Sequence, residues 1–101
     1  MGRMYNPPHP GALLKENLEE MHLSNREFAD RIGVSQATVS RFVNEKSALT
    51  PELAIRISKV LSGPDAEMWL AMQADYDVWQ TEQKFDFSKL IPLVPPVALS
   101  H

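Results

Sequence analysis

Residues 23–44, LSNREFADRIGVSQATVSRFVN, decide how the rest of the chain folds. Apolar residues recur here at the spacing of one helix face, first at Phe28, Ala29 and Ile32, and then at Val39, Phe42 and Val43. Gly33 stands between the two sets, where a chain leaving a helix often needs a left-handed backbone that glycine adopts without strain. We therefore predict two short helices that pack against each other across a tight turn.

Residues with helix-capping chemistry stand at the start of both helices. Ser24 and Glu27 form the S-x-x-E pattern of a capping box, and Ser35 suits the N-cap of the second helix. Ala29 is small where the second helix has to cross closely. Such a pair is a helix-turn-helix, and its second helix, here about residues 35–44, normally enters the DNA major groove as the recognition helix.

The stretch resembles the helix-turn-helix of the XRE, or phage-repressor-like, family. It has an alanine in the first helix, a glycine four residues later, a valine–serine pair, and a recognition helix that ends near Asn44. The runs HPG at residues 9–11 and LTPELA at residues 49–54 are similar to those of the HigA/VapI group of antitoxins. The resemblance covers about residues 5–80. It implies an all-α, five-helix, lambda-repressor-like fold and the antitoxin of a type II toxin–antitoxin pair.

The flanking sequence predicts a helix before the motif and another after it. The first runs from Pro10 to about His22, with an apolar stripe of Leu13, Leu14, Leu18 and Met21. The later helix has Thr50 as N-cap and Pro51 in its first turn. It should extend to about residue 61 and bury Leu53, Ile57, Val60 and Leu61.

A fifth helix is predicted to start at Pro64 and Asp65 and to end near Gln83. Aromatic and apolar residues repeat along it at intervals of three and four: Trp69, Met72, Tyr76 and Trp79. This stripe either packs into the core or forms a surface for a second copy or a partner protein.

We divide the chain into an N-terminal arm (1–9), a helix-turn-helix DNA-binding domain (10–83) and an apolar tail (84–101). The tail contains three residues that exclude a regular helix or a central strand: Pro92, Pro95 and Pro96. It is nevertheless too apolar for a disordered linker. We expect it to be irregular and to pack on its own domain, on a second subunit or on a different protein.

The overall composition predicts a small protein of the cytoplasm with no membrane association. The 101 residues suit one domain whose modest core would gain stability from a partner or a second copy. The sequence has no apolar run long enough to span a bilayer and no pattern of a secretion signal. The absence of cysteine excludes disulfides and thiolate metal sites.

The net charge of −3 argues against a nucleic-acid partner, but the distribution of charge weakens this argument. Residues 24–59 carry a net charge of +2 and residues 60–101 carry −4. This asymmetry is expected if one end of the protein faces DNA and the other faces a basic protein.

The recognition helix offers four candidate base-reading residues: Gln36, Ala37, Ser40 and Arg41. Glutamine can pair with adenine through two hydrogen bonds, arginine can pair with guanine, and alanine can contact a thymine methyl group. Candidate contacts to DNA phosphates are Asn25, Thr38, Asn44 and Lys46. The alternative is that these side chains form an ordinary solvated face. Arg56 is more ambiguous, because it could simply pair with Glu52 one turn earlier.

Two residues depart from the pattern of the family that the chain resembles. The family usually has glutamine where Asn25 stands, and commonly glycine where Glu45 stands. Glu45 places a negative charge near any bound DNA backbone and removes the residue that most easily adopts a left-handed backbone. Both departures would be expected in a protein-interaction module that keeps the scaffold but has lost DNA binding.

No catalytic constellation is evident, and we expect neither an enzyme nor a cofactor or metal site. The three histidines, His9, His22 and His101, lack acidic or thiol partners at the spacing of metal ligands. His9 is better explained as the cap of the first helix.

The resemblance to HigA implies a homodimer that binds operator DNA and a HigB-like toxin that cleaves mRNA. The antitoxin would neutralise this ribonuclease and repress its own operon. The alternatives are a stand-alone repressor of the XRE family with no toxin, and the interaction module described above.

Overall fold

The computed structural model describes residues 6–93 and contains five helices. They are α1 (Pro10–Glu20), α2 (Asn25–Ile32), α3 (Gln36–Val43), α4 (Pro51–Val60) and α5 (Ala66–Lys84). Over this range the chain forms no β-strand, so the prediction of an all-α, five-helix fold is confirmed. None of these helices is long and apolar enough to cross a membrane.

Each helix begins at a side chain that accepts a hydrogen bond from the first turn; these caps are His9, Ser24, Ser35, Thr50 and Asp65. The capping box is complete, because Glu27 N–H donates to Ser24 Oγ over 3.0 Å and Ser24 N–H donates to Glu27 Oε1 over 2.8 Å. Gly33 ends α2 with a φ of 77°, in the left-handed region. The local signals of residues 23–44 are therefore confirmed.

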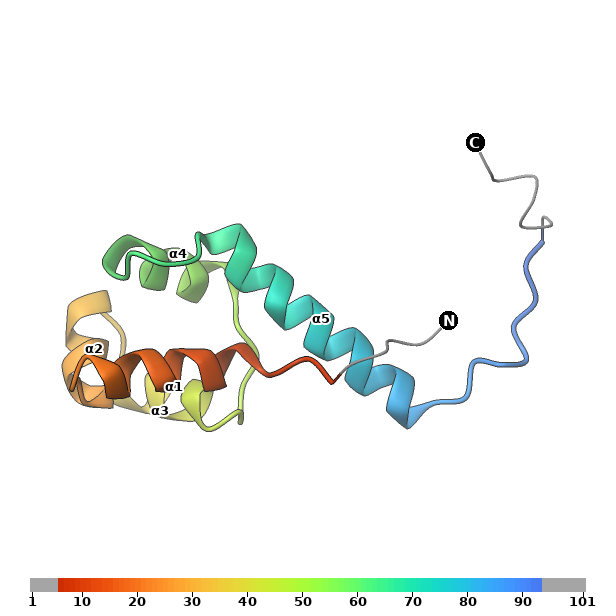
Figure 1. The fold of residues 1–101 in the computed structure, drawn as a ribbon, viewed down its shortest axis with the longest axis horizontal. Helices are drawn as coiled ribbons and strands as arrows, with labels where there is room; N and C mark the ends of the chain where they lie inside the picture. The colour runs from red at the N-terminus through yellow and green to blue at the C-terminus, as the bar shows by residue number, and fades with distance from the viewer. Residues whose placement is uncertain (1–5, 94–101) are drawn as a thin grey trace.

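The core joins α1, α2 and α3 to the pair formed by α4 and α5 (Figure 1). α1 lies against α3, and Gly11 is required at their crossing because a Cβ there would collide with the Phe42 carbonyl. The fully buried large side chains include Leu14, Phe28, Phe42, Ile57 and Trp69. The motif is thus held from one side by α1 and from another by α4.

α5 takes part in the core only through its N-terminal half. Trp69 is completely buried, and its indole N–H has no hydrogen-bond partner within residues 6–93. Further along, Tyr76 and Trp79 are half-buried, and the Tyr76 ring packs edge-on against His9 with ring centroids 4.9 Å apart. The predicted stripe therefore packs into the core at its start. Toward its C-terminal end, α5 extends away from the other four helices (Figure 1).

Two residues predicted to be buried are instead exposed. Met21 is 44% exposed, because α1 ends at Glu20 and the chain turns through His22, whose φ is 57°. Val60 is 43% exposed as the last residue of α4. Both predictions were wrong because apolar spacing continued past the end of the packed surface.

The described part of the tail, residues 85–93, contains no helix or strand. Its apolar side chains are exposed: Phe85, Phe87, Leu90, Ile91 and Leu93. This part is not buried in the core of the domain, although Phe87 lines an open hollow on α5 with Val78 and Thr81. Figure 1 shows the end of the segment running away from the helices. Residues 1–5 of the predicted arm and 94–101 of the predicted tail lie outside the described range.

Candidate nucleic-acid interface

α3 presents a mostly polar face to solvent because its large apolar residues point the other way. Val39, Phe42 and Val43 are buried, whereas Gln36, Ala37 and Arg41 are exposed and Ser40 is half-buried. The cap at Ser35 fixes the start of the helix, so these positions fall in its first two turns. The four predicted base-reading residues therefore share the outer side of one helix.

The Arg41 guanidinium has no hydrogen-bond or ion-pair partner among the described residues, so its donors are available to a ligand. Ser40 is less free, because its hydroxyl accepts a hydrogen bond from Asn44 Nδ2 over 3.4 Å. An unpaired arginine on the outer face of such a helix has the chemistry needed to read guanine.

The four predicted phosphate contacts belong to α2, to α3 with its C-cap, and to the loop that follows α3. Asn25 is half-buried at the first position of α2, directly after the N-cap of that helix. Thr38 is half-buried, with its hydroxyl oxygen 2.9 Å from Ser35 Oγ. Asn44 caps the end of α3, and Lys46 is exposed in the loop that follows. All four are near helix ends, where backbone and side-chain donors can face an anion.

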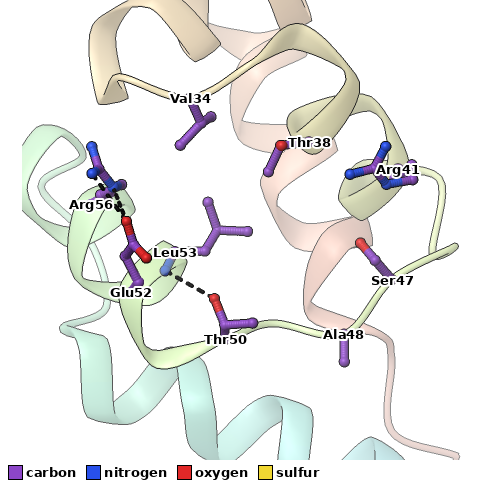
Figure 2. A pocket seen from close by; sticks show the side chains of 9 residues that line it. All are labelled: Val34, Thr38, Arg41, Ser47, Ala48, Thr50, Glu52, Leu53 and Arg56. Carbon is purple, nitrogen blue, oxygen red and sulfur yellow. Dashed lines mark hydrogen bonds and ion pairs between the residues drawn. The ribbon is translucent and has the colours of Figure 1, made fainter.

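A cleft of about 350 Å³ lies between α3 and the start of α4 (Figure 2). Thr38 and Arg41 line it from α3, and Ser47 lines it from the connecting loop. Across the cleft stand Thr50, the N-cap of α4, and Glu52 and Arg56 within α4. Ser47 was missed by sequence reasoning, although its position one residue after Lys46 could have indicated it. The cleft gives the recognition helix a polar border with hydroxyl and guanidinium groups.

Arg56 ties α4 to the turn of the motif. It pairs with Glu52 at 3.0 Å, as the spacing had suggested, and its Nη1 also donates to the Ile32 carbonyl over 2.8 Å. A longer contact of 3.4 Å reaches the Gly33 carbonyl. The carbonyl contacts, which sequence reasoning missed, satisfy acceptors left over at the end of α2. Arg56 therefore positions the motif.

Glu45 adopts a left-handed backbone, with φ at 61°, immediately after the cap of α3. The sequence places glutamate where glycine would adopt this conformation most easily, and the chain keeps the conformation with glutamate. The carboxylate is exposed beside Lys46. Glu45 thus combines backbone strain with a negative charge next to the candidate interface.

Gln73 is a second positioning residue that sequence reasoning missed. Its side chain is 6% exposed, and its Oε1 accepts a hydrogen bond of 2.8 Å from Leu49 N–H. Its Nε2 donates to Asp77 Oδ1 over 2.9 Å. Gln73 thereby anchors the α3–α4 connection to α5.

His9 acts as the predicted cap, because Gly11 N–H donates to His9 Nδ1 over 2.9 Å. The ring is buried between Phe42 and Tyr76. Residues 6–93 contain no group of three or more side chains that could hold a metal ion.

The helix-turn-helix family profile matches residues 14–67 of this chain. This protein belongs to the helix-turn-helix family, in its XRE branch. A similar relative is the uncharacterized HTH-type transcriptional regulator YddM of Escherichia coli, 40% identical over 91% of this chain and 97% of its own length. Antitoxin HigA-1 of Vibrio cholerae is 35% identical, with 78% of this chain and 74% of that protein covered.

Among solved structures, the antitoxin HigA of Pseudomonas aeruginosa with the higBA promoter matches with a TM-score of 0.77. It is 28% identical, and the match covers 87% of this chain and 99% of that one. The chain thus has the fold of DNA-binding antitoxins, and its family is one of transcription regulators and antitoxins, not a family of enzymes.

Proposed function

We propose that this protein is the antitoxin of a type II toxin–antitoxin pair. It binds a palindromic operator as a homodimer, represses its own operon, and neutralises a HigB-like ribonuclease toxin. The observation that carries the DNA-binding half is the unpaired Arg41 on the exposed face of α3. The names of relatives and structural neighbours support the toxin-binding half.

In this proposal Gln36, Ala37, Ser40 and Arg41 read bases in the major groove. Asn25, Thr38, Asn44 and Lys46 contact phosphates and fix the register of α3, since phosphate contacts position a protein without specifying sequence. The cleft beside Thr38 and Arg41 gives the sugar–phosphate backbone a place next to the recognition helix.

The proposed homodimer follows from the small number of bases that one recognition helix can reach. Two helices about 34–36 Å apart, one turn of DNA, would read the two halves of a palindrome. The exposed apolar residues of 85–93 supply a surface for association. This segment also carries Asp86 and Lys89, and a self-complementary contact benefits from charges of both signs.

A stand-alone repressor with no toxin is the second candidate. It is favoured by the relative YddM, which bears the name of a transcriptional regulator and matches nearly its whole length. The DNA chemistry is the same in both cases, so only the toxin distinguishes them.

The DNA-binding half is tested by fluorescence anisotropy with the duplex that precedes the gene, compared with a scrambled duplex. Specific binding should weaken steeply as salt rises, because each phosphate contact releases a counterion. Equal, weak binding to both duplexes would favour the interaction module.

The toxin half is tested by expressing the product of the adjoining small gene, with and without this protein. Growth arrest that this protein relieves, together with a stoichiometric complex, supports the antitoxin. Growth without arrest would favour the stand-alone repressor.

A further inference from the structure

An open groove of about 510 Å³ lies between α1, with the residue that follows it, and the connection from α4 to α5. Apolar side chains line it from both elements, Leu13 and Met21 on one side and Val60 and Leu61 on the other. Met21 and Val60 are 44% and 43% exposed, the two residues that local spacing had wrongly assigned to the interior. The groove is thus an apolar surface left uncovered by the fold.

The rim of this groove is negatively charged. Glu20 lines it, and Glu16 lies one helical turn earlier on the same side of α1. α1 ends at Glu20 with no basic residue in its last turn, so the negative end of its dipole is not compensated. The α1 residue Lys15 does not line the groove, and neither does Lys59 of α4.

The positive end of the α5 helix dipole does not cancel the negative charge at the rim of the groove. α5 begins just after Pro64, which lines the groove, but Asp65 caps its first turn and Glu67 adds a second carboxylate there. The groove therefore combines exposed apolar side chains with an acidic border. Charge complementarity favours a segment that presents an apolar side chain beside lysine or arginine.

The groove and the recognition face lie on different sides of the protein. Gly11 of α1 faces α3 at the Phe42 carbonyl, whereas the groove residues Leu13, Asn17 and Glu20 belong to another face of α1. In Figure 1, α3 lies behind α1. A protein seated in the groove would therefore leave α3 free to contact DNA.

We propose that this groove docks a basic segment of the toxin, with an apolar side chain between Met21 and Val60 and a lysine or arginine paired with Glu20. This inference rests on the proposed antitoxin function, and it assigns the toxin to a specific surface. Ribonucleases bind an anionic polymer and are expected to be basic, which matches the acidic border.

The test uses isothermal titration calorimetry between the full-length protein and the purified product of the adjoining small gene. Glu20→Lys reverses the charge at the groove and should weaken toxin binding about tenfold or more. Glu19→Lys is the matched control, because it makes the same change in the same helical turn but about 100° around α1. Val60→Gln tests the apolar part separately.

Either lysine complements the α1 dipole, so neither variant should lower the melting temperature. We expect Glu20→Lys and Val60→Gln to weaken toxin binding, Glu19→Lys to leave it within about twofold, and operator affinity to stay unchanged in all three. Toxin binding that is equal in all variants and the wild type would overturn the groove assignment while leaving the antitoxin function intact. No binding by the wild-type protein would overturn both.

Discussion

Arg41 lies on the outer side of α3, and its guanidinium has no partner within the described chain. Replacing it with alanine should leave the fold intact and relax the preference for one base pair. A lost bidentate contact corresponds to about 1–3 kcal/mol of discrimination. The measurement is anisotropy with the operator and with duplexes altered at single positions, alongside a melting curve.

Lys46→Ala is the matched comparison for Arg41. It should weaken binding to all sequences about equally and reduce the salt slope by about one. An Arg41→Ala variant that behaves in this same way, with operator preference retained, would show that Arg41 contacts phosphate and not a base.

Glu45 holds a left-handed backbone that glycine adopts without strain. Glu45→Gly should therefore raise the free energy of unfolding by about 1 kcal/mol. It should also strengthen DNA binding, because it removes a negative charge beside the interface. Glu45→Gln separates the two effects, since it removes the charge but keeps the strained side chain. A glutamine variant as stable as the glycine variant would contradict the backbone explanation.

At the scale of the helix, the capping box gives α2 a defined dependence on pH. The Ser24 backbone N–H donates to the Glu27 carboxylate and holds its pKa below the ordinary value. The ionised Glu27 carboxylate thus stabilises the folded protein fully above the pKa of glutamate in the unfolded chain, about 4.3. This stabilisation is lost as the pH falls through the lower pKa that Glu27 has in the folded protein.

Denaturant unfolding at a series of pH values from 6 downward checks this dependence. The difference in unfolding free energy between the wild type and Glu27→Gln should shrink as the pH falls below about 4.3. If this difference stays constant over the range, the negative charge of Glu27 does not contribute to the stability of the capping box.

The turn between α2 and α3 depends on Gly33. Its φ of 77° is unfavourable for a branched side chain, and an added Cβ would lie 2.9 Å from the Arg56 guanidinium. We expect Gly33→Val to destabilise the protein by about 2 kcal/mol or more, and Gly33→Asn to cost clearly less because asparagine tolerates this backbone. Thermal unfolding measures the stability of both variants. A Gly33→Val variant that unfolds at the same temperature as the wild type would contradict the assigned turn.

The helices could be predicted from the sequence because their signals are local. Ser24, Glu27 and Gly33 act within a few residues of themselves, and each has the predicted role in the structure. The contacts of Gln73 with Leu49 and of Arg56 with the Ile32 carbonyl could not be predicted, since each joins residues 24 positions apart. The exposure of Met21 and Val60 depends likewise on where neighbouring helices end. For the candidate interface, the sequence predicts which side chains share the exposed face of α3. It does not predict the cleft beside this face, because the cleft is formed by residues of both α3 and α4.

At the scale of the whole molecule, the exposed residues of 85–93 extend beyond a domain that is already closed around its own core. Deleting residues 85–101 should therefore abolish the proposed dimer while preserving the helices. Light scattering coupled to gel filtration would give the monomer mass, and circular dichroism would show retained helicity. If the full-length protein has the mass of a dimer and the truncated protein does too, the association surface lies elsewhere.

The two tryptophans lie in contrasting surroundings along one helix. Trp69 is completely buried in the apolar core, whereas Trp79 is half-buried in the part of α5 that leads into residues 85–93. Because indole emission shifts to longer wavelength as water reaches the ring, each tryptophan reports on a different event. With Trp79 changed to phenylalanine, the remaining fluorescence follows the opening of the core. With Trp69 changed to phenylalanine instead, the remaining fluorescence comes from Trp79 and reports whether a binding partner covers the C-terminal part of α5.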